Sequence, residues 1–259
     1  MLGTEFHTGS PVWLDVASPD PDRTAAFYGA VFGWRFTSAG PDAGGYGYLQ
    51  KDGATVAAVG RLTEQGARPA WMTYFRADDV QAAAGTVTSA GGTVRVAPMT
   101  MGEASMAQFT DPQGAQFAVL RSGQGLQRTS QDDSLVWVEL HTGDPESAVG
   151  FYHRLFGWRS AEMKAPGMTY RVLSIAAGDQ QEGSFGGVAP LQDSPQARWM
   201  PYFAVADVDA TATAVQDNGG TVLMPPSDLP DVGRVAWLTD PTQAAFAVLK
   251  PNPRGTAQA

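Results

Sequence analysis

Short segments in which apolar and polar residues alternate occur along the chain, and several are followed by a pattern typical of a helix. Residues 11–16 read PVWLDV, which fits a strand, and Phe27 and Val31 then recur at helical spacing. Asp20 is suited to the N-cap of that helix and Gly33 to its end. The pattern therefore predicts a strand, then a helix between these two residues, then short strands.

The chain carries this pattern twice over its whole length. Residues 10–36 return in closely similar form as residues 134–160. Further along, the segment FTDPQGAQFAVL at 109–120 returns as LTDPTQAAFAVL at 238–249. A repeat of this length indicates a duplicated domain, because solenoid repeats are only about 20–50 residues long.

Within each copy the order of strand, helix and short strands itself occurs twice. In the first copy the second round has a strand at 71–75 and a helix that begins after Asp79. The segment between the copies is rich in Gly, Ser and Gln and lacks apolar periodicity, which predicts an extended, poorly packed linker. We predict a first domain at 1–121, a linker at 122–133, a second domain at 134–250 and a tail at 251–259.

Composition and charge limit the classes of partner. The formal net charge is −9 and no run of Lys or Arg is present, so a nucleic-acid partner is not expected. The absence of cysteine excludes a disulfide and a thiolate nucleophile. No signal peptide and no apolar run of membrane-spanning length is found. We expect a cytoplasmic monomer or homodimer with a small-molecule ligand and no membrane partner.

Two motifs resemble a known superfamily. One is FY followed by FGW, at 27–34 and again at 151–158, and the other is the Asp-Pro-x-Gly turn at 111–114. Both are similar to motifs of the vicinal oxygen chelate superfamily, which includes glyoxalase I, bleomycin-resistance proteins and extradiol dioxygenases. The resemblance implies an α+β fold with two tandem glyoxalase-like domains, each of two βαβββ modules that form an open, curled mixed sheet around a cavity. It implies little about the reaction, because this fold hosts many chemistries.

The resemblance also implies where a metal ion would bind. Metal-using relatives carry His, Gln or Glu at strand positions that correspond here to Trp13, Met72 and Ala118 in the first half and to Trp137, Met200 and Ala247 in the second. None of these side chains is a ligand for a divalent ion, which prefers imidazole or carboxylate. We therefore expect neither a metal ion nor another cofactor.

Strand alternation predicts which side chains line each cavity. The alternation places Val12, Leu14 and Val16, like Val136, Val138 and Leu140, against the helices. The opposite face then carries a wall rich in aromatic residues and methionine, which suits a partly apolar organic ligand. The predicted ligand-binding residues are Trp13, Met72, Tyr74, Gln116, Trp137, Met200 and Tyr202.

Three residues on the same faces are candidates for acid/base catalysis. Glu139 and Asp15 occupy matching positions, and a carboxylate among apolar strand residues costs free energy unless it is solvated, paired or functional. His141 matches Ala17, so only the second half has a Glu-x-His pair, which could be an acid/base dyad or half of a metal site. The alternatives are a structural hydrogen bond for the carboxylates and a solvated histidine. We expect the second domain to be the functional one.

Functions of different classes fit these features. The first is a protein of the bleomycin-resistance type that binds a small, partly apolar organic molecule in a metal-free cavity. The alternative is an enzyme of natural-product or xenobiotic metabolism, such as a hydroxylase, isomerase, cyclase or lyase, that uses the acid/base residues. A metal-dependent glyoxalase or dioxygenase fits least well, because the metal-ligand positions lack suitable side chains.

Overall fold

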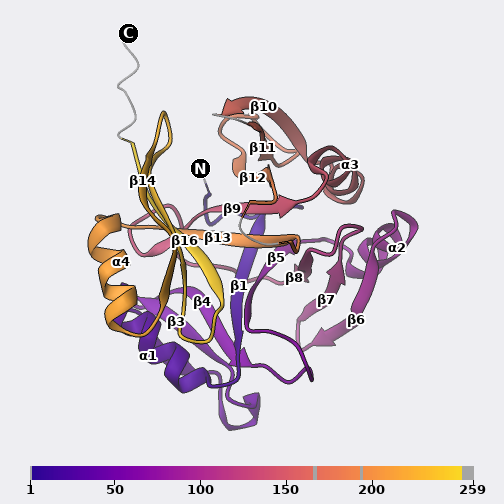
Figure 1. Cartoon of the computed structure of the whole chain (residues 1–259). Helices are drawn as coiled ribbons and strands as arrows, with labels where there is room; N and C mark the ends of the chain where they lie inside the picture. The colour runs from indigo at the N-terminus through magenta and orange to yellow at the C-terminus, as the bar shows by residue number, and fades with distance from the viewer. Residues whose placement is uncertain (1, 166–167, 193–194, 253–259) are drawn as a thin grey trace.

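The computed structural model describes residues 2–165, 168–192 and 195–252, which form two eight-stranded sheets and four α-helices (Figure 1). The elements of the first half are β1 (Pro11–Ser18), α1 (Pro21–Phe32), β2 (Arg35–Ser38), a 3₁₀ turn (Pro41–Ala43), β3 (Gly47–Lys51), β4 (Ala54–Arg61), β5 (Ala70–Arg76), α2 (Val80–Ser89), β6 (Thr93–Met101), β7 (Ala104–Thr110) and β8 (Gln116–Arg121). Those of the second half are β9 (Ser134–Thr142), α3 (Pro145–Phe156), β10 (Arg159–Ala165), β11 (Met168–Ser174), β12 (Ser184–Pro190), β13 (Arg198–Ala204), α4 (Val208–Asp217), β14 (Thr221–Leu229), β15 (Gly233–Thr239) and β16 (Ala245–Pro251).

The two sheets have the same strand order. The first runs β2-β3-β4-β1-β5-β8-β7-β6, and the second repeats this order with the corresponding strands β9 to β16. In the first sheet β1 pairs in parallel with β4 and antiparallel with β5, so two βαβββ modules meet at the β1–β5 pair. Neither sheet closes on itself. The predicted α+β fold with two modules in each of two tandem domains is confirmed.

The helices begin and end where the sequence predicts. The Asp20 carboxylate accepts a hydrogen bond from the backbone N–H of Arg23 at the start of α1, and Gly33 ends the helix with a φ of 69°. The corresponding residues of α3 are Asp144 and Gly157, which has a φ of 71°. None of the helices in the described part of the chain is long and apolar enough to cross a membrane.

One hydrophobic core serves both halves of the chain. The rings of Phe32 and Trp34 from the first half lie 5.4 and 5.2 Å from the ring of Phe203 on β13. In the matching contact, the ring of Trp158 lies 4.9 Å from that of Phe75 on β5. The FGW motif therefore packs between the domains.

Two buried tyrosines form hydrogen bonds between the domains. The Tyr28 hydroxyl of α1 donates to the Asp240 carboxylate at 3.4 Å, and the Tyr152 hydroxyl of α3 donates to the Asp111 carboxylate at 3.1 Å. Burial raises the pKa of both carboxyl groups, and the hydrogen bonds that they accept oppose this shift. The tyrosine of each FY motif is thus paired with the aspartate of an Asp-Pro turn in the opposite domain.

The segment at 122–133 corrects the prediction of a poorly packed linker. The Leu126 side chain is only 1% exposed, and its backbone N–H donates to the Val12 carbonyl at 3.0 Å. The next residue, Gln127, donates its backbone N–H to the Thr55 carbonyl at 2.8 Å. The segment is fixed because one apolar side chain enters the core and backbone groups pair with the first sheet.

The predicted tail at 251–259 is described only at its start. Pro251 is the last residue of β16, and Asn252 donates its backbone N–H to the Val232 carbonyl at 3.0 Å. Residues 253–259 lie outside the described part of the chain.

Candidate functional site

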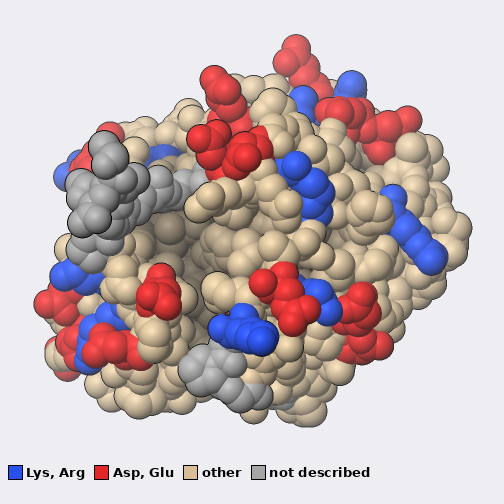
Figure 2. Space-filling model, turned by 90° about the horizontal axis from the view of Figure 1, so that it is seen from above, with Lys and Arg blue, Asp and Glu red and all other residues tan. Residues whose placement is uncertain are grey.

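Each sheet has one face on the shared core and an opposite face, here called the outer face, that carries its own small cluster of side chains. On the first outer face the cluster includes Tyr74, Met106 and Ala118, with Trp13 and Met72 packed against it. The second sheet curls, and Figure 2 shows a hollow on the side toward which β10, β11 and β14 project in Figure 1.

Two valines lie on the outer faces, contrary to the strand alternation predicted from sequence. Val12 belongs to the outer cluster of the first sheet and Val136 to that of the second. The pairing of β1 with β5 shifts register between Pro11 and Trp13, and the pairing of β9 with β13 skips Val136 in the same way. Such a bulge places two successive side chains on one face, so the prediction was wrong for these two residues.

Glu139 lies at the centre of a hydrogen-bond network on the second outer face. Its Oε1 atom lies 2.7 Å from His141 Nε2 and accepts a hydrogen bond from the Tyr202 hydroxyl at 2.8 Å. Its Oε2 atom accepts from the Tyr170 hydroxyl at 2.7 Å. The two tyrosine oxygens in turn accept from tryptophan N–H groups, Trp137 to Tyr170 at 2.9 Å and Trp237 to Tyr202 at 3.0 Å.

This network keeps Glu139 ionised although the residue is buried. The Glu139 side chain is 10% exposed and that of His141 is 0% exposed. Burial on its own raises the pKa of the carboxyl group, but the hydrogen bond and charge of His141 and the two tyrosine hydroxyls outweigh burial and lower the pKa below its usual range. Burial and the Glu139 charge raise the pKa of Tyr170 and Tyr202, so both phenols stay protonated donors.

A glycine makes room for the Tyr170 contact. The sequence GSFGG at 183–187 predicts a bend or a close approach of two backbones, and the structure places 184–187 in strand β12. A Cβ atom on Gly187 would lie 2.0 Å from the Tyr170 hydroxyl oxygen, and one on Gly186 would lie 2.4 Å from the Val138 carbonyl. The close approach is confirmed, and only glycine at 187 lets Tyr170 reach Glu139.

The first outer face carries a matching but looser network around Asp15. The Tyr74 hydroxyl donates to Asp15 Oδ2 at 2.9 Å, and the Tyr46 hydroxyl donates to the same atom at 3.3 Å. The Trp13 N–H donates to the Tyr46 oxygen at 3.0 Å. Ala58 lies beside Asp15, where the second sheet has Gly187 beside Glu139.

Asp15 is electrostatically different from Glu139. Burial raises the pKa of Asp15 to about 6, because the hydrogen bonds from Tyr74 and Tyr46 only partly offset the loss of solvation. The position that matches His141 is Ala17, so no imidazole stabilises the charge of Asp15. Asp15 can therefore exchange a proton near neutral pH, whereas the lowered pKa of Glu139 keeps that carboxyl group ionised there.

The remaining predicted ligand residues differ in accessibility. Met72 and Trp13 are partly exposed on the first outer face, whereas Met200 is fully buried on the second. Gln116 is exposed at the start of β8, and its Oε1 atom accepts a hydrogen bond from Arg95 Nη1 at 2.9 Å. Arg95 also pairs with Glu64, so Gln116 belongs to a polar contact separate from the Asp15 network.

The positions at which relatives bind metal do not fit a divalent ion here. Trp13 pairs with Tyr74, which pairs with Ala118, so the first set of positions does meet on three adjacent strands. An indole, a thioether and a methyl group supply no hard or borderline donor atom. Within the ranges that the structure describes, no group of three or more His, Cys, Asp or Glu side chains could hold a metal ion.

Three members of the networks were not predicted from the sequence: Tyr46, Tyr170 and Trp237. Tyr46 and Tyr170 occupy the same place in the two copies, which was an available signal. Trp237 matches Gln108 in the first copy, and Gln108 is likewise a hydrogen-bond partner of the Tyr74 side chain. These residues lie far from Asp15 and Glu139 in sequence and reach them only through the pairing of the strands.

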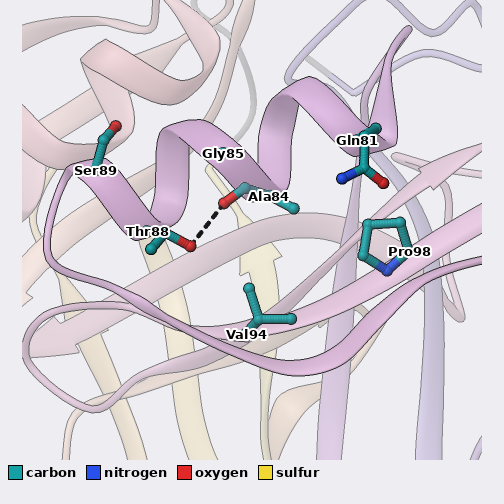
Figure 3. A pocket seen from close by; sticks show the side chains of 7 residues that line it. All are labelled: Gln81, Ala84, Gly85, Thr88, Ser89, Val94 and Pro98. Carbon is teal, nitrogen blue, oxygen red and sulfur yellow. Dashed lines mark hydrogen bonds between the residues drawn. The ribbon is translucent and has the colours of Figure 1, made fainter.

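A separate hollow of about 480 Å³ lies between α2 and β6 (Figure 3). Small or apolar side chains such as Ala84, Val94 and Pro98 line it, and the Thr88 hydroxyl is already bonded to the Ala84 carbonyl at 3.0 Å. None of its lining residues is titratable or belongs to either network. We therefore place the candidate site on the outer faces.

The model of one protein family, described as the glyoxalase/bleomycin resistance protein/dioxygenase superfamily, matches residues 10–119 and 134–248. A Mycobacterium tuberculosis protein named "Putative glyoxylase CFP32" is 36% identical, over 97% of this chain and 98% of its own length. The "Anthracycline biosynthesis protein DnrV" of Streptomyces peucetius is 39% identical, over 95% of each chain.

Solved structures show the same fold at low sequence identity. A Mn(II)-bound glyoxalase from Novosphingobium aromaticivorans superposes with a TM-score of 0.66 and 17% identity, over 94% of this chain and 82% of the other. A 2,2',3-trihydroxybiphenyl 1,2-dioxygenase from Sphingomonas wittichii gives a TM-score of 0.65 and 14% identity, over 94% and 91%. At this identity the likeness concerns the fold alone.

Proposed function

Because the chain belongs to the glyoxalase/bleomycin resistance protein/dioxygenase superfamily, we propose that it binds a small, partly apolar organic molecule on an outer face without a metal ion. The observation that carries the proposal is the replacement of the metal-binding side chains by Trp13, Met72 and Ala118, and by their counterparts in the second domain. These side chains offer aromatic and thioether surface beside a single carboxyl group. Such a lining recognises a ligand by packing and one or two hydrogen bonds.

We propose a planar aromatic natural product as the ligand class. One relative, similar over nearly its whole length, is named as an anthracycline biosynthesis protein. Planar fused rings pack well on tryptophan and methionine side chains, and Trp13 and Met72 are partly exposed on the first outer face. The negative charge of the protein also suits a neutral or cationic ligand better than an anionic one.

A second candidate function is acid/base catalysis on such a molecule. Asp15 favours it, because a partly buried carboxyl group with a pKa of about 6 can both take up and release a proton at neutral pH. The Tyr74 hydroxyl, 2.9 Å from Asp15, would hold the carboxylate in place during transfer. Glu139 and His141 fit this role less well, because both are buried and Glu139 is held by three donors.

Equilibrium dialysis of the purified full chain against an anthracycline tests the binding proposal, with and without EDTA. We expect saturable binding that is unchanged by the chelator, and elemental analysis should find no stoichiometric Fe, Ni, Zn or Mn. About one metal ion per domain, with binding lost on chelation, would refute the metal-free site. Chemical conversion of the bound ligand, lost in Asp15→Asn, would favour the catalytic alternative over simple binding.

A further inference from the structure

The two network carboxylates differ in which oxygen atoms are occupied. Both oxygens of Glu139 accept hydrogen bonds, Oε1 from His141 and Tyr202 and Oε2 from Tyr170. Both hydrogen bonds to Asp15, in contrast, go to Oδ2. Among the described residues Asp15 Oδ1 has no such donor, so one acceptor atom of this network is not used by the protein itself.

The two carboxylates also differ in exposure, and Asp15 is the more accessible one. Taken as whole residues, Glu139 and His141 are 7% and 0% exposed, and Met200 beside them is fully buried. Asp15 is partly exposed, as is Met72 on the neighbouring position of β5, whereas Trp13 and its counterpart Trp137 are partly exposed on both outer faces. A molecule that approaches the first outer face thus meets an open acceptor next to apolar surface, whereas the second outer face presents little of its carboxylate.

We propose that the first domain is the ligand-recognition domain, and that Asp15 Oδ1 accepts a hydrogen bond from a hydroxyl group of a planar aromatic ligand. The inference rests on the proposed function and assigns it to one of the two outer faces. It reverses the expectation from sequence, which favoured the second domain because of its Glu-x-His pair. The aromatic rings pack on Trp13 and Met72 while the hydroxyl group reaches the carboxylate.

The second network then has a positioning role in the fold. Its two tyrosines and His141 place a donor on each oxygen of Glu139, and its two tryptophans donate to the tyrosine oxygens, so neither Glu139 oxygen is without a donor. A duplicated domain can keep one copy for binding and use the matching residues of the other to stabilise a sheet. The residue that pairs with the carboxylate also differs between the copies, Ala58 in the first and Gly187 in the second. Glycine at 187 leaves room for the close contact of Tyr170 with Glu139.

Protonation of Asp15 provides an independent readout. A hydroxyl group donates more strongly to a carboxylate than to a neutral carboxyl group. The titratable groups that face Asp15 are Tyr74 from β5 and Tyr46 ahead of β3, and neither titrates below pH 8, because burial and the Asp15 charge raise the pKa of both. On the neighbouring strand β4, the residue that pairs with Asp15 is Ala58, which carries no charge. The preference for a hydroxyl-bearing ligand should therefore fall as the pH drops through about 6.

The test compares 2-(hydroxymethyl)anthraquinone with its methyl ether, a pair that differs in one hydrogen-bond donor and carries no charge. Dissociation constants are measured by equilibrium dialysis at pH 7.5 with EDTA for the wild-type chain and for Asp15→Asn, Glu139→Gln and Tyr170→Phe. We expect the wild type to prefer the alcohol about tenfold, which is the effect of one hydrogen bond to a charged acceptor. Asp15→Asn should reduce this preference to less than about twofold, while the two second-domain variants retain it.

The outcomes separate this inference from the proposal on which it rests. If neither anthraquinone binds the wild type, the proposed function fails and the inference fails with it. If both bind, but the preference for the alcohol is absent, survives in Asp15→Asn or disappears in Glu139→Gln, the inference alone is overturned. The wild-type preference measured from pH 5 to 8 needs no variant, and a preference that does not change across pH 6 also overturns it.

Discussion

Replacement of Glu139 by glutamine should destabilise the protein, because the change removes a buried charge on which three donors converge. The donors are His141, Tyr202 and Tyr170, at 2.7, 2.8 and 2.7 Å. Glutamine keeps one acceptor oxygen but presents an NH₂ group to the third donor. That donor loses its partner, and the other two bonds are no longer made to a charged acceptor.

The size of the effect follows from the energetics of such bonds. A hydrogen bond to a charged group contributes about 1.5–3 kcal/mol net, and a buried donor left without a partner costs about 1–3 kcal/mol. Because the tyrosine hydroxyls can rotate and recover part of this loss, we expect Glu139→Gln to lower the free energy of unfolding by about 2–4 kcal/mol. For a chain of this size the melting temperature should fall by roughly 5–15 °C.

Asp15→Asn is the matched control, because it removes the corresponding carboxylate from the first domain. The raised pKa of Asp15 means that the folded state disfavours the ionised form, so at pH 7 the substitution should leave the melting temperature unchanged or raise it. Urea unfolding followed by circular dichroism, together with calorimetry, measures both variants. If Glu139→Gln unfolds within about 0.5 kcal/mol of the wild type, the network cannot be the buried, charge-assisted arrangement described above.

The ionised carboxylates of Glu139 and Asp15 should change the free energy of unfolding in opposite directions as the pH varies. The pKa of Glu139 is lowered in the folded state, so its stabilisation is fully present above its usual value of 4.5 and is lost as the pH falls through the folded-state pKa. The pKa of Asp15 is raised from 3.8 to about 6, so ionisation costs stability as the pH rises between those values. Asp15→Asn should therefore gain stability relative to the wild type between pH 4 and 7.

Four further substitutions test the packing. Gly187→Ala should displace the Tyr170 hydroxyl from Glu139 and cost about 1–3 kcal/mol in urea unfolding, while Ala58→Gly in the first domain should cost no more than about 1 kcal/mol. Phe203→Ala should cost about 3–5 kcal/mol and leave a single calorimetric transition, since both halves share one core; two separate transitions would contradict this. Leu126→Ala should cost about 2–4 kcal/mol, whereas a loosely packed linker would tolerate it without change.

The sequence alone determined the features that depend on neighbours close in the chain. Local capping determines where two of the helices begin and end. The structure has the starts at Asp20 and Asp144 and the ends at Gly33 and Gly157, where the pattern predicts them. The duplication and the two modules per domain follow from comparing the chain with itself. Strand alternation also placed Asp15 beside Trp13, and Glu139 beside Trp137, on one face. These features are readable because period and capping act over a few residues.

Only the tertiary structure decided what the carboxylates contact and which of them is open. Tyr170 reaches Glu139 from two strands away, across the glycine at 187, whereas Ala58 and the longer Tyr46 contact leave the first network looser. The bulges at Val12 and Val136 and the packing of the FGW motif between the domains were likewise not predicted. The physical reason is that register, curvature and burial depend on contacts between segments far apart in the chain. Among the described residues, those contacts give both oxygens of Glu139 a donor and leave Asp15 Oδ1 without one.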